Sequence, residues 1–391
     1  MIYLSILLLL SGVLGATIPI KKLPMWVIPV LGALVALLIG AASMHTLINT
    51  SRQFSSPLGF LLSVVPLAVM LDRFGYFGQL AELIAHGKSL TTGLWILACL
   101  TVVLFNLDGA VVLLTPLYVH IAKRRNLNPV RVAIMPALAA TCASGLLPVS
   151  NLTNLLAVAH SHPTIGNYLS HMGPPVLLAC VISWLFLKLR LRSDINEKPE
   201  KIPVDKRVIT IGSSALGVML VGFLIGPTFS IEPWMVTLAM ALTFSIFTKK
   251  FEVKSIPFGT ALLALSLGVL SESVLTHLSL NSLFNASSQL GVLKAIGGGA
   301  IGANLVNNLP ATLVGLHSLP QVPSPGLWAL LIGVDMGPII LAIGSLHCLL
   351  WQNMMKQLGC EVDSFTYAKW GLTISLPGFL AASALLILMV P

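Results

Sequence analysis

The stretch FNLDGA at residues 105–110 interrupts one apolar run, and VNNLPA at residues 306–311 interrupts another in the same way. Each interruption places amide or acidic side chains between apolar residues. Two longer apolar runs, 130–158 and 326–355, contain a proline and polar residues near their centres. A straight helix of that length would exceed the roughly 30 Å of a bilayer core. We therefore predict that each of these two runs is one broken helix with an unwound centre.

The composition excludes a soluble protein. The 391 residues are 56% hydrophobic and only 9% charged, and the mean hydropathy is +0.93. A soluble globular chain carries roughly 25% charged residues. The sequence therefore predicts an integral membrane protein, and not a soluble enzyme, a nucleic-acid binder or a disulfide scaffold. The five cysteines are scattered without paired spacing, so neither a disulfide framework nor a zinc site is expected.

The basic residues predict the topology. The runs 91–122 and 295–320 are either spans or re-entrant hairpins, and we interpret both as hairpins. The remaining runs then give ten crossings, five on each side of the polar linker at 190–207. With the side of Lys21 and Lys22 taken as the inside, only Arg52 and Lys294 lie outside, which leaves 20 of the 22 basic residues inside. Inserting 91–122 as a full crossing would remove this asymmetry, so the positive-inside rule favours hairpins.

Five crossings per half require the second half to be inserted upside down relative to the first. We predict an all-α polytopic membrane protein with two inverted-topology repeats, residues 1–189 and 208–391, joined by a cytoplasmic linker at 190–207. It would have about ten transmembrane helices, two re-entrant helical hairpins and two broken helices. The similarity of 105–110 to 306–311 supports this weakly. The alternative is a chance similarity between two apolar helices with polar interruptions.

The four interruptions share small, amide and acidic residues, which suits backbone that lines a wet cavity. The candidate substrate-binding residues are Asn106, Ser150, Asn151, Asn154, Asn307, Asn308 and Ser345. Asp108 and Asp335 are the two acids placed well inside apolar stretches, and an intramembrane carboxylate is a functional candidate. We assign proton coupling to both. The alternatives are a helix cap for Asp108 and a structural hydrogen bond for Asp335.

The interruptions contain no lysine or arginine. A site for a di- or tricarboxylate should offer more than helix dipoles against several negative charges. The polar centre therefore suits a neutral polyhydroxylated molecule or a small cation better than a multivalent anion.

These residues resemble the arsenical pump membrane proteins, the arsenite-efflux branch of the ion transporter superfamily. The resemblance is carried by 105–116 and 306–315 as hairpin tips, and by 148–154 and 333–351 as broken crossings. One departure is Ile339, where the family often has a lysine after Pro338. The resemblance implies export of arsenite or antimonite, as the neutral trihydroxide, in exchange for protons across a bacterial or archaeal plasma membrane. It also implies an optional cytosolic ATPase partner, and the sequence leaves a homodimer open.

Two rival functions are kept. The first is a sodium/proton antiporter of the same superfamily, in which the two acids would ligate sodium. The second is a membrane scaffold or channel subunit without transport. An enzyme is not expected, because no nucleophile–base pair shares a helix face, and neither a cofactor nor a resident metal is predicted.

Overall fold

The computed structural model describes residues 2–17, 23–85, 89–191, 203–249, 252–275, 280–284, 286–339 and 344–390. All the regular secondary structure in these ranges is helical. The elements before the linker are α1 (Ile2–Thr17), α2 (Val27–Leu38), α3 (Met44–Arg73), α4 (Tyr76–Ala85), α5 (Leu90–Phe105), α6 (Leu107–Arg124), α7 (Pro129–Ala133), α8 (Met135–Ala143), η1 (Pro148–Ser150), α9 (Leu152–Ser161) and α10 (Ile165–Arg190).

The elements after the linker repeat the same kinds of helix. They are α11 (Lys206–Ile225), η2 (Gly226–Phe229), α12 (Pro233–Thr248), η3 (Val253–Ser255), α13 (Phe258–Leu275), α14 (Asn281–Phe284), α15 (Gln289–Val306), α16 (Asn308–His317), α17 (Pro325–Met336), α18 (Leu346–Gln357), α19 (Ser364–Trp370), the π-helical η5 (Gly371–Ser375) and α20 (Leu376–Leu388). Most of the linker lies outside the described residues.

The outer surface of the bundle is apolar, as expected for a protein embedded in lipid. Five helical stretches are long and apolar enough to cross a membrane, namely Met44–Arg73, Ile165–Arg190, Lys206–Phe229, Val253–Leu275 and Ser364–Leu388. Large apolar side chains such as Leu189, Val218 and Leu388 are exposed on them. A surface of this kind is stable against acyl chains and unfavourable in water. The chain is a multi-pass membrane protein, and the count of ten crossings remains a prediction.

One helix extends well beyond the apolar part of its sequence. The apolar run at 57–71 is part of α3, which already begins at Met44. Ser43 caps this helix: its hydroxyl accepts a hydrogen bond from the amide of Thr46, whose own side chain bonds back to the Ser43 amide. This capping box starts the helix within a polar segment that hydropathy alone does not mark.

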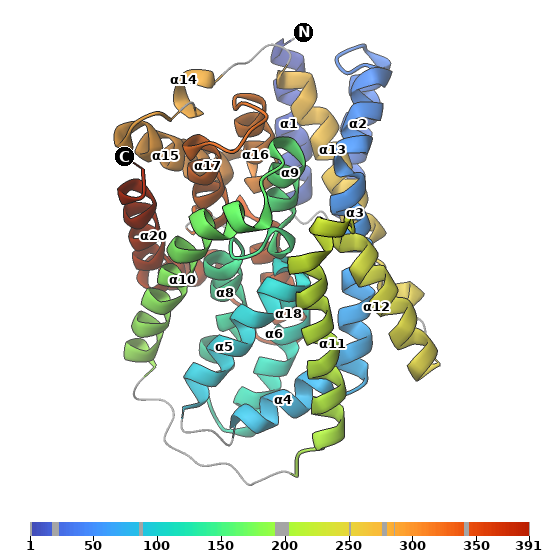
Figure 1. The fold of residues 1–391 in the computed structure, drawn as a ribbon, viewed down its shortest axis with the longest axis vertical. Coiled ribbons are helices and arrows are strands. Elements are labelled where there is room, and N and C mark those ends of the chain that lie inside the picture. Colours follow the sequence, from blue (N-terminus) through green and yellow to red (C-terminus); the bar gives the residue numbers. More distant parts are fainter. Residues whose placement is uncertain are drawn as a thin grey trace.

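Two helical hairpins approach each other from opposite ends of the molecule. In the first, the Tyr118 hydroxyl of α6 donates to the carbonyl of Leu94 on α5 at 2.5 Å, and both residues are equally far in sequence from Asn106. In the second, Gly302 of α15 packs against Ala311 of α16. Figure 1 shows α5 and α6 in the lower half of the molecule and α15 and α16 in the upper half. The two tips line the same cavity, through Asn106 in the first and Asn307 in the second.

The second hairpin is seated on α17 by glycines. A Cβ atom on Gly333 would lie 2.4 Å from the carbonyl oxygen of Ile296 on α15. A Cβ atom on Gly299 would lie 3.1 Å from the carbonyl oxygen of Leu330. Because both helices carry glycine where they cross, their backbones approach more closely than larger residues would allow.

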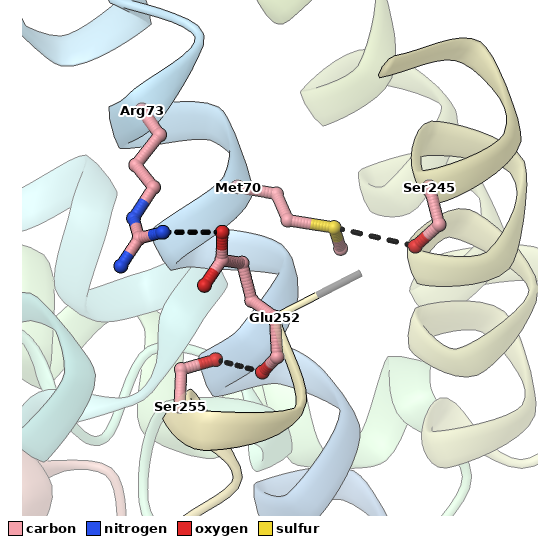
Figure 2. A network of polar contacts seen from close by, with 5 residues as sticks. All are labelled: Met70, Arg73, Ser245, Glu252 and Ser255. Carbon is pink, nitrogen blue, oxygen red and sulfur yellow. Dashed lines mark hydrogen bonds and ion pairs between the residues drawn. The ribbon is translucent and has the colours of Figure 1, made fainter. Parts of the chain in front are cut away.

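An ion pair ties the end of α3 to the connection between α12 and α13. Arg73 Nη1 lies 2.5 Å from Glu252 Oε1, and the Ser255 hydroxyl donates to the Glu252 carbonyl at 2.6 Å (Figure 2). The Ser245 hydroxyl of α12 donates to the Met70 sulfur at 3.3 Å in the same network. These contacts fix the lower end of α3 to its neighbours.

Two basic residues of the predicted inner face, Lys123 and Arg124, contact neighbouring elements in the described part of the chain. Arg124, at the end of α6, forms an ion pair with Glu82 of α4. Lys123 donates to the carbonyl of Leu358, just after α18, at 3.3 Å. Lys21, Lys22 and Lys88, which the topology prediction also used, lie outside the described residues.

Candidate functional site

The four interruptions enclose a central cavity of about 60 Å³, which has room for a few water molecules or one small polar solute. Its wall is apolar where α1, α3 and α13 face it. Its polar lining comes from both hairpin tips, both broken helices and one residue of α13: Asn106, Asp108, Asn151, Thr153, Thr260, Asn307, Asn308 and Ser345. The fold thus brings together residues from all four predicted breaks.

The two hairpin tips have the same backbone conformation. Asn106 has φ 70° and ψ 153°, and Asn307 has φ 77° and ψ 154°. Positive φ combined with ψ near 150° lies outside the left-handed helical region and is adopted almost only by glycine, so each asparagine holds a strained backbone. Each side chain also caps the helix that follows, since Oδ1 of Asn106 accepts from the Asp108 amide and Oδ1 of Asn307 accepts from the Leu309 amide. Asparagine therefore supplies the cap of each tight reversal while its backbone carries strain.

The two broken helices also match in backbone. Asn151 (φ −149°, ψ 145°) precedes α9, and Ser345 (φ −153°, ψ 145°) precedes α18. Their side chains differ in use, because Asn151 caps α9 by accepting from the Thr153 amide, whereas Ser345 makes no capping bond. Four helices, α6, α9, α16 and α18, have their N-termini at the cavity. Their aligned peptide dipoles favour negative partial charge there.

Asp335 lies behind the cavity wall and joins the two halves. Its side chain is buried, and Oδ1 accepts from Asn151 Nδ2 at 2.8 Å and from the Thr153 hydroxyl at 2.7 Å. Oδ2 is buried without a hydrogen-bond partner among the described residues. Asp335 is therefore not a lining residue. Its carboxyl group bonds directly to Asn151 and Thr153, which line the cavity.

Asp108 faces the cavity from the first turn of α6. The cap of this helix is Asn106, so the alternative that assigns Asp108 the capping role is wrong. The side chain is half-buried, and within the described part of the chain its Oδ1 atom has no hydrogen-bond partner. Because the cap is supplied elsewhere, this carboxyl group remains available for cargo or a proton.

Two predicted binding residues do not line the cavity. The Ser150 hydroxyl donates to the Val103 carbonyl at 3.2 Å and accepts from the Leu147 amide at 3.2 Å. Asn154 Nδ2 donates to the Ser144 carbonyl at 2.7 Å. Both side chains therefore stabilise the unwound segment by bonding its backbone. The sequence does not distinguish this role from cargo binding, because amide and hydroxyl groups suit both.

Two lining residues were missed as candidate binding residues. Thr153 lies in the predicted break at 148–154, but the sequence does not show that its hydroxyl, and not that of Ser150, faces the cavity. Thr260 lies in the first turn of α13, next to an apolar run, and nothing in its sequence context marks it as facing the cavity.

A family model described as "Citrate transporter" matches residues 7–333. The chain belongs to the citrate transporter family. It is 25% identical over 385 residues to the arsenical pump membrane protein of Escherichia coli strain K12, with 89% of each chain covered. It is 28% identical over 361 residues to the arsenical pump membrane protein of Yersinia enterocolitica, covering 81% of this chain and 82% of that one.

The fold resembles that of a solved transporter. The YdaH transporter of Alcanivorax borkumensis, described as having an unusual topology, superimposes with a TM-score of 0.57 at 16% identity. The match covers 99% of this chain and 97% of that one. The family and its relatives are membrane transporters, so the prediction that this chain is a transporter and not an enzyme is confirmed, as is the resemblance to the arsenical pump proteins.

Proposed function

We propose that this protein is a secondary active transporter that exports arsenite or antimonite, as the neutral trihydroxide, in exchange for protons. The observation that carries the proposal is the small central cavity, whose polar lining consists of amides, hydroxyls, one carboxyl group and helix N-termini. None of its lining residues in the described part of the chain is lysine or arginine. A neutral solute with several hydroxyl groups can both donate to and accept from such a lining.

A multivalent anion fits this lining poorly. A tricarboxylate needs charged donors, and here it would meet helix dipoles and the carboxyl group of Asp108. The cavity volume of about 60 Å³ also favours a cargo of few atoms. The family is described as a citrate transporter family, whereas the relatives are named as arsenical pump proteins. Of these two kinds of cargo, the metalloid hydroxide fits the cavity better.

Proton coupling is assigned to Asp108 and Asp335. Each has one buried carboxyl oxygen without a partner in the described residues. A carboxyl group in this state can take up a proton without breaking an existing hydrogen bond at that atom. Each acid also comes from a different half of the chain, and each lies at or directly behind the cavity wall.

The topology belongs to the same proposal. Inverted repeats at 1–189 and 208–391 are supported by the matched backbone angles of Asn106 with Asn307 and of Asn151 with Ser345. We place the protein in the plasma membrane of a bacterium or archaeon, with the linker inside. A cytosolic ATPase partner and a homodimer remain predictions from the resemblance.

Flux in everted membrane vesicles tests the proposal. Arsenite, antimonite and sodium are compared at a fixed pH gradient, with empty-vector vesicles as the control. We expect saturable arsenite and antimonite uptake that stops when the pH gradient is dissipated. Sodium-dependent proton flux without metalloid transport would contradict it. Unsaturable flux would indicate a channel, and no flux above the empty-vector control would indicate a scaffold.

One observation favours sodium as the second candidate. Ser144 Oγ, Asn154 Oδ1 and Asp335 Oδ2 are all buried and lack hydrogen-bond partners among the described residues. Asn154 Nδ2 donates to the Ser144 carbonyl, and a Cβ atom on the adjacent Gly145 would lie 3.6 Å from Asp335 Oδ2, so the three residues belong to one buried region. Oxygen atoms of this kind suit a hard cation. The sodium arm of the vesicle assay decides between the two candidates.

A further inference from the structure

A second, larger cavity lies beside the first broken helix. Its volume is about 420 Å³, compared with about 60 Å³ for the central cavity. It is bounded by residues 147–149 of the unwound segment, by α9 and by residues 227–233, which connect α11 to α12. We propose that this cavity, the outer vestibule, is the chamber through which cargo passes from the central cavity to the outer medium. This inference rests on the proposed export of a metalloid hydroxide and assigns the route of its release.

The two cavities share one wall, which is the unwound segment of the first broken helix. Residues 147–149 line the outer vestibule. Asn151 and Thr153, which follow directly in the chain, line the central cavity. Between them, the Ser150 hydroxyl fixes the segment by donating to the Val103 carbonyl at 3.2 Å. The wall is therefore a single stretch of backbone, and cargo reaches the vestibule when this stretch moves.

Helix α3 runs past both cavities and gives their order. Ser56 lines the outer vestibule, and Leu61 lines the central cavity. With a rise of 1.5 Å per residue, the two positions lie about 7.5 Å apart along the helix axis. The helix ends at Arg73, which the predicted topology places on the inner face. Because Ser56 is farther from Arg73 than Leu61 is, the vestibule lies on the outer side of the central cavity.

The vestibule is open at an end that carries polar side chains. His162, Ser230 and Glu232 line it and are exposed. Helix α11 begins at Lys206, at the lower end of Figure 1, and Glu232 follows its other end. Acyl chains accommodate a carboxylate and an imidazole poorly. The open end therefore faces water, and the predicted topology places that water outside.

The lining of the vestibule suits release better than binding. Most of its residues are apolar, including the buried Val149, Leu155 and Phe223. The buried hydroxyl of Tyr168 already donates to the Gly145 carbonyl at 2.9 Å. A neutral trihydroxide that enters the vestibule therefore exchanges the amide and hydroxyl partners of the central cavity for water. A chamber that holds its cargo weakly allows it to leave.

Single cysteines in the lining test the vestibule. In a variant whose five native cysteines are replaced by alanine, Ser56→Cys and Val158→Cys each place a thiol in the half-buried part of the lining. A trimethylammonium methanethiosulfonate reagent, which does not cross the membrane, is added outside intact cells. We expect both thiols to react and arsenite export to slow at least threefold, because the attached group narrows the route and adds a fixed charge.

Thr228→Cys is the matched control. Thr228 is exposed in the same connection between α11 and α12, but it does not line the vestibule. We expect its thiol to react from outside without a change in export. A second test keeps the native cysteines: the double variant Ser56→Trp with Val158→Trp fills the vestibule with two indole rings. We expect export to slow at least tenfold at an unchanged melting temperature, and Thr228→Trp to behave as the wild type.

Three results overturn the vestibule. The first is reaction of Ser56→Cys and Val158→Cys only in everted vesicles, which would place the cavity on the inner side. The second is reaction only with the membrane-permeant N-ethylmaleimide, which would show that lipid fills the cavity. The third is normal export after modification or in the double tryptophan variant. Labelling requires no cargo, so absence of arsenite transport in the wild type would instead refute the proposed function.

Discussion

The carboxylate of Asp335, at the end of α17, accepts a hydrogen bond of 2.8 Å from the amide nitrogen of Asn151, at the start of α9. One residue belongs to the second half of the chain and the other to the first. The Thr153 hydroxyl adds a bond of 2.7 Å to the same oxygen. The two unwound segments are therefore held together directly, and the cavity wall and the buried acid form one hydrogen-bonded unit.

Replacing Asp335 by Asn should uncouple transport while the protein stays folded. Asparagine keeps an oxygen that can accept from Asn151 and Thr153, but it cannot bind and release the proton. We expect arsenite exchange to continue and pH-driven accumulation in vesicles to disappear. Asp335→Leu, as the comparison, leaves two buried donors unpaired and should cost about 1–3 kcal/mol for each, which a lower melting temperature in detergent would reveal.

Asp108→Asn should have the same functional effect with a smaller structural one. Asn106 supplies the cap of α6, so the change leaves the helix start intact. We expect normal yield and melting temperature with loss of pH-driven accumulation. Full proton exchange and full arsenite resistance in both Asp108→Asn and Asp335→Asn would show that the coupling assignment is wrong.

The tip asparagines should tolerate glycine better than alanine. Alanine at Asn106 loses the cap, worth about 1 kcal/mol, and retains the backbone strain of this conformation, about 1–3 kcal/mol. Glycine also loses the side-chain cap, but it adopts φ near 70° without strain. We expect a higher melting temperature for Asn106→Gly than for Asn106→Ala. The same order should hold at Asn307, and equal melting temperatures for Gly and Ala would contradict this account.

Gly333→Ala should disturb the seat of the second hairpin. The added methyl group would lie 2.4 Å from the Ile296 carbonyl, so the backbones of α15 and α17 must separate. We expect reduced stability and reduced transport together. Gly297→Ala is the matched control, because a Cβ atom there meets nothing within 4 Å. Similar melting temperatures for the two variants would refute the tight crossing.

Asp363 should make the start of α19 sensitive to acid. Hydrogen bonds from the Thr366 side chain and backbone amide hold the pKa of Asp363 below its usual value of 3.8. The backbone amide of Thr366 donates to Asp363 Oδ1 at 2.9 Å. A lowered folded-state pKa means that the carboxylate cap stabilises the fold above the ordinary pKa, and that this stabilisation is lost as the pH falls through the lowered one. Asp363→Asn retains a cap that does not titrate. Its melting temperature should therefore change less than that of the wild type between pH 5 and pH 3, and parallel curves would exclude the effect.

Much of the helical layout could be predicted because apolar runs and their polar interruptions are local features of the sequence. The interruptions at 105–110 and 306–311 are the hairpin turns, and Pro148 lies in the unwound part of the first broken helix. The start of α3 is not marked by hydropathy, because a capping box at Ser43 extends this helix into polar sequence. Residues 340–343, within the second broken helix, lie outside the described part.

The composition of the site was less predictable than its location. Amide and hydroxyl residues cluster in the breaks, but sequence does not say which of them faces inward. Ser150 and Asn154 turn out to bond backbone carbonyls, whereas Thr153 and Thr260 line the cavity. The direction of a side chain in unwound backbone depends on φ and ψ at each residue, and no periodic pattern reports these angles.

The convergence of four helix N-termini on one chamber means that its electrostatic polarity is built from peptide groups. Such a field does not titrate, and exchanging a lining side chain does not abolish it. Homologous chains can therefore diverge in the shape and reach of the lining, and so in the solute they carry, while inheriting the same underlying attraction for electron-rich atoms.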